Sequence, residues 1–362
     1  MSSLGKPLRI VHTETPVREI WSRLSYFESE HNAKEFLKKF SLSNNELADT
    51  ASSLAYTIKT AREYYEAAER VTVLTQPLLI FYGMTALSKV LFISTHGKKS
   101  PSTEHGLRKI KGWNGVFAEL SVVVGKDGTF PQFHGCYNKE NLHNLTFSMK
   151  ELVSLVPEVK VEFETVYKEE KSQALKILRR PDGIHIVDTE LDRYKDLAKL
   201  IFTIPGVNEI YLPHTQEVED KLILYYSGID RAAKDLAVRA VSGEEYLVIP
   251  LIKGSKNIFL PEMSVHFLTM YLLGMLSRYQ PKEWGEIIKG EESGEIYIIR
   301  KFLEATTRKF PNLILNELRD RNFVFVSPKI ETGTEKKFDR GQLEDIFDYV
   351  NRRLAEEIRR LR

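Results

Sequence analysis

A basic segment in the first third of the chain carries residue types that can bind a phosphate group. Residues 98–113 also contain glycine and serine, and their basic and aromatic members are Lys98, Lys99, His105, Arg108, Lys109, Lys111 and Trp113. Lysine and arginine donate charge-assisted hydrogen bonds to phosphate oxygens, and histidine exchanges a proton near neutral pH. A solvated lysine-rich loop would have the same composition, so both interpretations stay open.

The spacing of His105 and Arg108 suggests one arrangement for chemistry. If the residues after Gly106 are helical, side chains three positions apart lie on one face of the helix. His105 would then serve as a general acid or base and Arg108 as a phosphate clamp, with Lys109 as a further binding residue.

A second candidate binding segment ends a predicted buried helix late in the chain. Arg278, Tyr279 and Trp284 belong to residue types that are enriched in binding hot spots. The same residues would also make a structural corner in which Trp284 packs against Pro281. Tyr82 is a further candidate, because it lies in an apolar stretch and a buried tyrosine hydroxyl needs a hydrogen-bond partner.

The common motifs for metals, cofactors and hydrolysis are absent. The nine histidines never occur as His-x-x-x-His, and Cys136 is the only cysteine, so no zinc-binding spacing exists. The glycine-rich phosphate loops and the Gly-x-Ser-x-Gly elbow are also missing. We therefore expect no metal and no cofactor, and no catalytic residue can be named. Whether the chain is an enzyme stays open, with a non-enzymatic role favoured.

The helical start of the chain resembles HEPN-type bundles, many of which cut RNA with an arginine and a histidine on one helix. The matching spacing here is Arg179 or Arg180 with His185. Pro181-Asp182-Gly183 lies between them and predicts a turn, so the pair does not lie on a continuous helix.

The overall composition limits the classes of partner. Lysine and arginine total 52 and aspartate and glutamate total 50, so no global charge attracts nucleic acid or an anionic membrane. Residues 1–10 lack the apolar core of a signal peptide, and the apolar run 265–276 is shorter than the ~20 residues of a membrane span. We expect a cytoplasmic protein.

Hydrophobic periodicity divides the chain into three segments. Residues 1–95 predict helices, with Pro16 as a first helical residue, a capping box at Ser43–Glu46 and an apolar, buried central helix over 78–93. Residues 261–362 return to helices, and the predicted ones are 262–279, 295–309, a short one after Pro311 and a last one from Gly341, with a strand at 323–326.

The middle segment, residues 96–260, predicts strands. The candidates are a hairpin of 120–124 with 129–130, a half-buried strand at 159–163, and strands at 184–187, 209–212, 222–226 and 246–252, with a helix at 192–202. Few crossover helices separate them, so the sheet should be antiparallel or mixed. The predicted fold is helix-rich α+β: a helical bundle built from both chain ends, with an inserted β-containing module.

Several strings, in this order, resemble the YaaC-like family of bacterial proteins over about residues 20–320. They are Trp21 with Phe27 and Phe36-Leu37, Tyr64-Tyr65, the Pro77–Gly83 string, the His105–Lys109 string, Gly128-Thr129-Phe130, and the Ser277–Trp284 string. The resemblance implies no established catalytic residue. Members often lie beside the gene for IMP dehydrogenase, which implies a regulatory partner in purine metabolism.

Two functions are therefore expected from different classes. The first is a non-enzymatic cytosolic interaction or regulatory protein with a protein partner such as IMP dehydrogenase, with a homodimer as a further option. The second is a nucleotide- or RNA-acting effector that uses the basic segment to bind a nucleotide or phosphate. The position of His105, Arg108, Arg278 and Trp284 in space would distinguish a shared site from separate structural roles.

Overall fold

The computed structural model describes most of the chain through Ser327. The described residues are 6–99, 102–110, 112–168, 170–180, 183–186, 222–224, 237–290 and 294–327. The predictions for residues 192–202, 209–212 and from Gly341 onward lie outside these ranges.

Helices form residues 16–96, as predicted, but residues 8–12 form a strand where the sequence analysis expected helix. The helices are α1 (Pro16–Leu24), η2 (Ser25–Glu28), α2 (Glu30–Leu37), α3 (Asn44–Ala68) and α4 (Gln76–His96). Pro16 is the first residue of α1, and Ser43 and Glu46 form the expected capping box at the start of α3. Gly97, with φ of 65°, ends α4 in the left-handed conformation that favours glycine.

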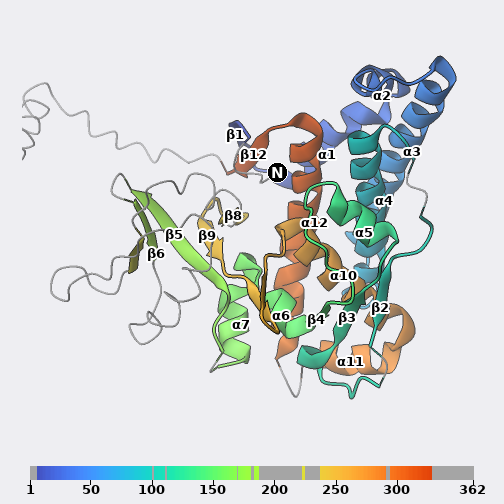
Figure 1. Ribbon diagram of the computed structural model, residues 1–362. Helices are drawn as coiled ribbons and strands as arrows, with labels where there is room; N and C mark the ends of the chain where they lie inside the picture. Colours follow the sequence, from blue (N-terminus) through green and yellow to red (C-terminus); the bar gives the residue numbers. More distant parts are fainter. Residues whose placement is uncertain are drawn as a thin grey trace, which may run out of the picture. The chain divides into compact units, whose positions relative to one another are not determined.

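The helices of the C-terminal part pack on the same bundle. They are α10 (Glu262–Tyr279), α11 (Pro281–Lys289) and α12 (Glu295–Arg319). Helix α4 contacts α3, α10 and α12, so it lies at the centre of a bundle drawn from both ends of the chain (Figure 1). This confirms the predicted helix-rich α+β class.

The break expected at Pro311 is wrong, because α12 continues through this residue. Proline removes the hydrogen-bond donor that would reach the Thr307 carbonyl, and this normally ends or kinks a helix. Phe310 and Ile314 on either side are fully buried. Their packing holds the helix together across the missing bond.

The described strands form four small sheets. Their bounds are β1 (Leu8–His12), β2 (Leu107–Lys109), β3 (Ser121–Val124), β4 (Thr146–Ser148), β5 (Ala174–Arg180), β6 (Gly183–Ile186), β7 (Leu222–Leu224), β8 (Ala237–Arg239), β9 (Glu245–Val248), β10 (Leu251–Lys253), β11 (Lys256–Ile258) and β12 (Asn322–Val326). The sheets β2-β3-β4, β7-β6-β5-β9-β8 and β10-β11 are antiparallel, and β1 pairs with β12 in parallel.

Short helices lie between these strands. They are η3 (Phe117–Glu119), α5 (Thr129–Gly135), α6 (Met149–Ser154), η4 (Pro157–Val159) and α7 (Lys160–Val166). Three strand predictions therefore need correction: Thr129-Phe130 begins α5, residues 159–163 belong to η4 and α7, and residues 246–252 are divided between β9 and β10. In α7, Phe163 is buried but Val161 is 72% exposed, so the alternation of apolar residues did not reflect a buried face.

One hydrophobic core joins the helices to the first part of the middle segment. Its buried members run from Ile20 in α1 to Phe325 in β12 and include Phe117, Phe130 and Phe147. The division of the chain into three segments itself stays a prediction.

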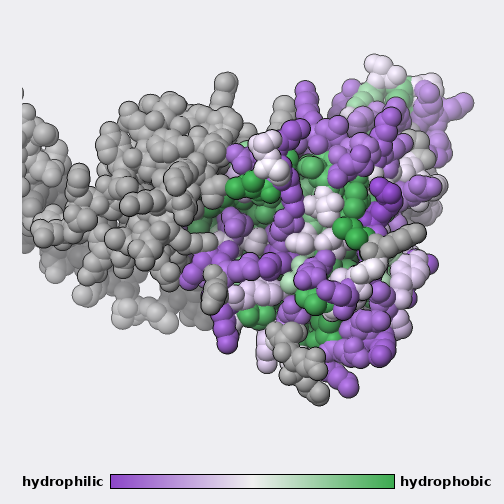
Figure 2. Space-filling model, turned by 60° about the horizontal axis from the view of Figure 1, so that its bottom comes forward, coloured by the Kyte–Doolittle hydropathy of each residue, from purple (hydrophilic) through white to green (hydrophobic). Residues whose placement is uncertain are grey.

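Among the described helices, α4 is long and apolar enough to cross a membrane, but most of its apolar window is buried in this core. Figure 2 shows that hydrophilic residues dominate one face of the described chain, with smaller hydrophobic patches between them.

Candidate functional site

Arg278 and Tyr82 meet at the surface, although 196 positions separate them in the sequence. Arg278 Nη1 donates a hydrogen bond of 2.9 Å to the Tyr82 hydroxyl oxygen. The Arg278 guanidinium carbon also lies 4.8 Å from the centroid of the Tyr279 ring, and the Tyr82 ring lies 5.5 Å from the ring of Tyr64. The last turn of α10 and the outer side of α4 therefore share one patch of cation and aromatic rings.

His105 lies next to this patch. Its ring is 5.1 Å from the Phe81 ring and 6.0 Å from the Tyr271 ring, and its Nδ1 is buried without a hydrogen-bond partner. Burial lowers the pKa of His105, and the positive charges of Lys89 and Arg278 lower it further. At neutral pH the ring is therefore uncharged, and its buried Nδ1 is left without a partner among the described residues. Tyr64, Tyr82, Lys89, His105, Arg278 and Tyr279 are called the Arg278 site below.

Lys89 reaches the Arg278 site from the same helix as Tyr82. The two residues are seven positions apart, and Thr85 lies between them, so the three follow one stripe of α4. Each of them is partly exposed while their neighbours along the helix are mostly buried. Neither Lys89 nor Arg278 has an ion pair with any carboxylate in the part of the chain that the structure describes.

Two glycines fix the backbone that carries His105. Gly106 and Gly128 have φ of 71° and 128°, and a Cβ atom on Gly128 would lie 2.3 Å from the Gly106 Cα. The backbone N–H groups of Thr129 and Phe130, in the first turn of α5, donate to the Glu104 and His105 carbonyls at 2.8 and 2.9 Å. The loop before β2 is therefore held by the start of α5.

Arg108 and Lys109 do not join His105 as the helical hypothesis required. Residues 107–109 form β2, in which neighbouring side chains point to opposite faces. Arg108 is exposed, and none of the described contacts connects it to His105. The shared site for His105 and Arg108 is thus wrong in its geometry, because the Gly106 turn leads into a strand.

Lys109 is engaged at the junction of α10 and α11. Its ammonium group donates to the side-chain carbonyl of Gln280 and lies 4.7 Å from the Trp113 ring centroid. Burial lowers the pKa of Lys109, and Glu283 partly opposes this effect. Lys109 therefore ties the basic segment to the α10–α11 corner.

Of the two interpretations of Trp284, a binding residue or part of a structural corner, its contacts fit the structural corner. It is fully buried, and its Nε1 donates to the Leu74 carbonyl at 2.9 Å. Ser277 Oγ donates to the same carbonyl at 2.9 Å. The segment 278–284 is not a loop, since Pro281 begins α11 directly after α10. Trp284 closes this corner, whereas Arg278 and Tyr279 remain exposed beside it.

A buried serine and histidine elsewhere resemble a nucleophile and its base. His134 Nδ1 lies 2.8 Å from Ser264 Oγ, and Tyr137 Oη lies 2.7 Å from the same oxygen. Ser264 has no exposed surface, and burial lowers the pKa of His134 to about 4. The group therefore has no route for a substrate. Nearby Cys136 is also inert as a nucleophile, because burial raises the pKa of its thiol to about 12.

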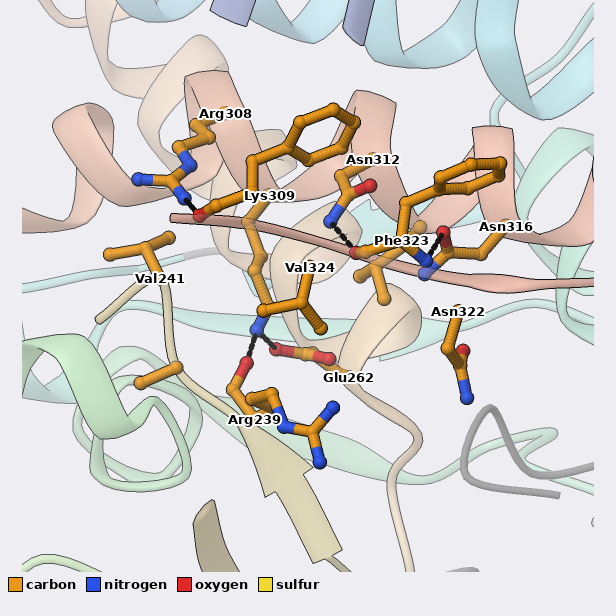
Figure 3. Close-up of a pocket in the computed structure, with 13 residues that line it drawn as sticks. Arg239, Val241, Glu262, Arg308, Lys309, Asn312, Asn316, Asn322, Phe323 and Val324 are labelled. Carbon is orange, nitrogen blue, oxygen red and sulfur yellow. Dashed lines mark hydrogen bonds and ion pairs between the residues drawn. The ribbon is translucent and has the colours of Figure 1, made fainter. Parts of the chain in front are cut away.

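A cavity of about 50 Å³ lies between α12, β12 and residues 239–241. It is far smaller than the ~300–1,000 Å³ of typical ligand pockets. Much of its polar lining bonds to β12, as Figure 3 shows: Asn312 Nδ2 donates to the Phe323 carbonyl at 3.1 Å, and Asn316 Oδ1 accepts from the Phe323 N–H at 2.9 Å. These residues complete the edge of a strand.

A buried charge cluster forms the floor of this cavity. Lys309 Nζ lies 2.9 Å from Glu262 Oε1 and also donates to the Arg239 carbonyl (Figure 3). It also lies 3.8 Å from Glu158 Oε1. Burial raises the pKa of Glu262 to about 7, although Lys309 opposes this shift. One lysine faces two carboxylates, and the raised pKa of Glu262 leaves this carboxyl only partly ionised near neutral pH, which limits the unbalanced charge in the core. The cluster is therefore explained by structure.

Other chemistry has little support among the described residues. Arg179 and Arg180 lie on β5 and His185 lies on β6, with Arg180 opposite Gly183, so the HEPN spacing falls on a hairpin. No group of three or more potential metal ligands occurs within the described ranges.

Reasoning from the sequence named four members of the Arg278 site and missed Lys89 and Tyr64. Lys89 lies within residues 78–93, which were predicted as an apolar, buried helix. The signal that could have found it is the helical spacing of Tyr82, Thr85 and Lys89, which places all three on one stripe.

Four of the strings that suggested a family lie at or next to this site. The Pro77–Gly83 string forms the first turns of α4, the His105–Lys109 and Gly128–Phe130 strings interlock through their glycines, and the Ser277–Trp284 string forms the α10–α11 corner. The family described as YaaC-like protein matches residues 25–318, which is most of the chain. The chain belongs to the YaaC-like family. Comparisons with curated proteins and with solved structures find no match.

The family match includes the Arg278 site but not the two ends of the chain. Every residue of the site lies within 25–318, whereas β1 and β12 lie outside it. The resemblance between this chain and other YaaC-like proteins therefore covers the whole site.

Proposed function

We propose that this YaaC-like protein is a cytoplasmic regulatory protein that binds a nucleotide-type ligand at the Arg278 site. The observation that carries the proposal is the pair of unpaired cations, Lys89 and Arg278, beside the unpartnered Nδ1 of His105. Positive side chains without carboxylates favour an anion, and a phosphate oxygen accepts hydrogen bonds from both. The exposed ring of Tyr279 and the partly exposed ring of Tyr82 offer flat surfaces on which a base could stack.

The arrangement supports binding over catalysis. His105 is the only imidazole in the site, and the rings of Phe81 and Tyr271 lie beside it. General acid–base chemistry on a phosphodiester normally uses two groups in complementary protonation states. The site supplies cations, a neutral imidazole and tyrosines, which are groups that hold a ligand.

Titration calorimetry of the full-length protein with a panel of purine and pyrimidine nucleotides, and with inorganic phosphate, tests the proposal. We expect one or more nucleotides to bind more tightly than phosphate. Arg278→Ala and Lys89→Ala should each weaken binding about tenfold or more, because a hydrogen bond to a charged group contributes about 1.5–3 kcal/mol. Lys289→Ala removes an exposed cation from α11 and should leave the affinity unchanged.

Two results would contradict this function. Equal affinities of the Arg278→Ala, Lys89→Ala and Lys289→Ala variants for a bound nucleotide would place the ligand elsewhere. Cleavage of RNA or of a nucleotide by the pure protein, abolished by His105→Ala, would replace the binding role with an enzymatic one.

We further propose that the regulated partner is an enzyme of purine metabolism such as IMP dehydrogenase. This partner follows from the family resemblance and from a site suited to a nucleotide. A direct test titrates the purified protein into IMP dehydrogenase, with and without the nucleotide found above. A nucleotide-dependent complex with altered dehydrogenase activity is expected, and the lack of any complex in both conditions would refute this partner.

A further inference from the structure

In the described part of the chain, one edge of strand β1 pairs with no other strand. Among the described strands β1 pairs only with β12, in parallel from Leu8 opposite Asn322 to His12 opposite Val326. The pair begins with the Asn322 N–H bonded to the Pro7 carbonyl and ends with the Thr13 N–H bonded to the Val326 carbonyl. The backbone groups of residues 9 and 11 therefore face β12, and those of Leu8, Ile10 and His12 face outward.

The opposite edge of this small sheet is already closed. The backbone groups of Phe323 and Phe325 face away from β1 and bond to side chains of α12: Arg308 donates to the Phe325 carbonyl at 2.5 Å, and Asn312 and Asn316 bond to Phe323. A two-stranded sheet with one closed edge can grow only at β1. Figure 1 shows β1 and β12 side by side.

The side chains of β1 are unusual for a free edge. Leu8 is 52% exposed and Ile10 is 55% exposed, and both point to the same face of the strand. Open edges are normally protected by charged side chains, proline or a bulge, because an unprotected edge pairs with other chains. Pro7 precedes β1 and the exposed Arg9 lies on its other face, whereas Leu8 and Ile10 leave their own face apolar. Val324 and Val326 in β12 lie opposite Ile10 and His12 and are partly exposed, so an apolar strip crosses both strands.

We propose that β1 pairs with β1 of a second copy of this chain, antiparallel about Ile10. The sequence Leu8-Arg9-Ile10-Val11-His12 fits its own copy in this register. Ile10 lies opposite Ile10 and Leu8 lies opposite His12, and these are the residues whose N–H and C=O groups face outward.

The same register avoids placing like charges opposite each other. Arg9 lies opposite Val11 of the second copy, whereas directly opposed arginines would repel. The exposed side chains of Leu8 and Ile10 from both copies would join the strips of the two β12 strands into one apolar face across four strands. A strand of five residues buries much less than the ~1,000 Å² of a tight interface, so the dimer depends on protein concentration.

Cysteine cross-linking of the full-length protein tests the register. The native Cys136 is first replaced by serine, and then Ile10→Cys and Val11→Cys are compared under mild oxidation. Opposed residues of a hydrogen-bonded antiparallel pair have Cα atoms about 5.5 Å apart, within the range of a disulfide. We expect the Ile10→Cys variant to form a covalent dimer and the Val11→Cys variant to form little, since the two Val11 positions are offset.

Light scattering over a range of protein concentrations tests whether the outer edge of β1 forms the dimer. Ile10→Pro removes an outward N–H that the β1–β12 ladder does not use, and it should shift the dimer toward monomer. Ile10→Thr keeps this N–H and should retain more dimer, while equal melting temperatures would show that both variants fold. A monomer at every concentration, equal cross-linking of the two cysteine variants, or a dimer unaffected by Ile10→Pro would overturn the proposal.

Discussion

Two glycine residues decide where the His105 imidazole lies. Gly106 and Gly128 approach each other so closely that a side chain on either would collide with backbone atoms of the other loop. Both also have positive φ, which residues with a Cβ atom rarely adopt. The strings His105-Gly106 and Gly128-Thr129 therefore act as one structural unit, although they are far apart in sequence.

Replacing Gly128 with alanine should destabilise the protein strongly. The Cβ atom would lie 2.3 Å from the Gly106 Cα, and the backbone at φ of 128° would be strained. We expect a loss of about 3 kcal/mol or more in the free energy of unfolding, measured by urea denaturation.

Gly135→Ala is the matched control, because Gly135 ends the helix α5 that Gly128 precedes. Nothing lies within 4 Å of a Cβ atom there, and its φ is not in the left-handed region. Its unfolding free energy should stay the same or rise by up to about 1 kcal/mol. Equal losses in the two variants would mean that the close approach of the two loops is not what fixes His105.

At the level of secondary structure, α12 supports β12 by side chains as well as by packing. Arg308, Asn312 and Asn316 follow one another at four-residue intervals, so they lie on one stripe of the helix. Together they satisfy the N–H of Phe323 and the carbonyls of Phe323 and Phe325. A helix thus replaces a neighbouring strand along this edge of the sheet.

Asn316→Ala should remove the most buried member of this row. The Phe323 N–H is buried and would lose its only described acceptor, Asn316 Oδ1 at 2.9 Å. A buried donor without a partner costs about 1–3 kcal/mol, so the urea midpoint should fall accordingly.

Lys301→Ala, on the same helix, provides a comparison. Lys301 forms only an exposed pair with Glu304, and such pairs contribute at most about 1 kcal/mol. A loss in Asn316→Ala no larger than that of Lys301→Ala would argue against the side-chain support of β12.

On the scale of the whole molecule, buried titratable groups link stability to pH in opposite directions. Burial lowers the pKa of His134 and His266 to about 4, and it raises the pKa of Glu262 to about 7. As the pH falls from about 6.5 toward 4, the unfolded chain binds protons at both histidines and the folded chain does not, so stability is lost. Between about pH 7 and 4.5 the folded chain binds the extra proton at Glu262, which adds stability.

Glu262→Gln should therefore make the protein more sensitive to acid. The variant lacks the proton uptake that opposes the two histidines. From pH 7 to pH 5 we expect its unfolding free energy to fall by about 2 kcal/mol more than that of the unmodified chain. Urea denaturation at both pH values measures the difference. Glu304→Gln, at an exposed position, should follow the unmodified chain, and an identical pH response of the two variants would refute this role of Glu262.

Local signals in the sequence determined most of the helical architecture. The capping box at Ser43, the proline that begins α1, and the apolar runs of α4 and α10 depend on neighbouring residues alone, and each is confirmed. Local signals failed where packing opposed them. Pro311 lies within a helix, and residues 159–163 alternate like a strand but form helical turns, because burial of Phe310, Ile314 and Phe163 outweighs the local preference.

The residue types of the Arg278 site were determined by the sequence, but their meeting was decided by the tertiary structure. His105, Tyr82, Arg278 and Tyr279 could be named from composition and spacing. Nothing local indicates that Arg278 bonds to Tyr82, that Arg108 is exposed on a strand, or that Trp284 is buried and bonds to the Leu74 carbonyl. The physical reason is that helix and turn preferences act over a few residues, whereas this site depends on the packing of α4 against α10, which lie nearly two hundred positions apart.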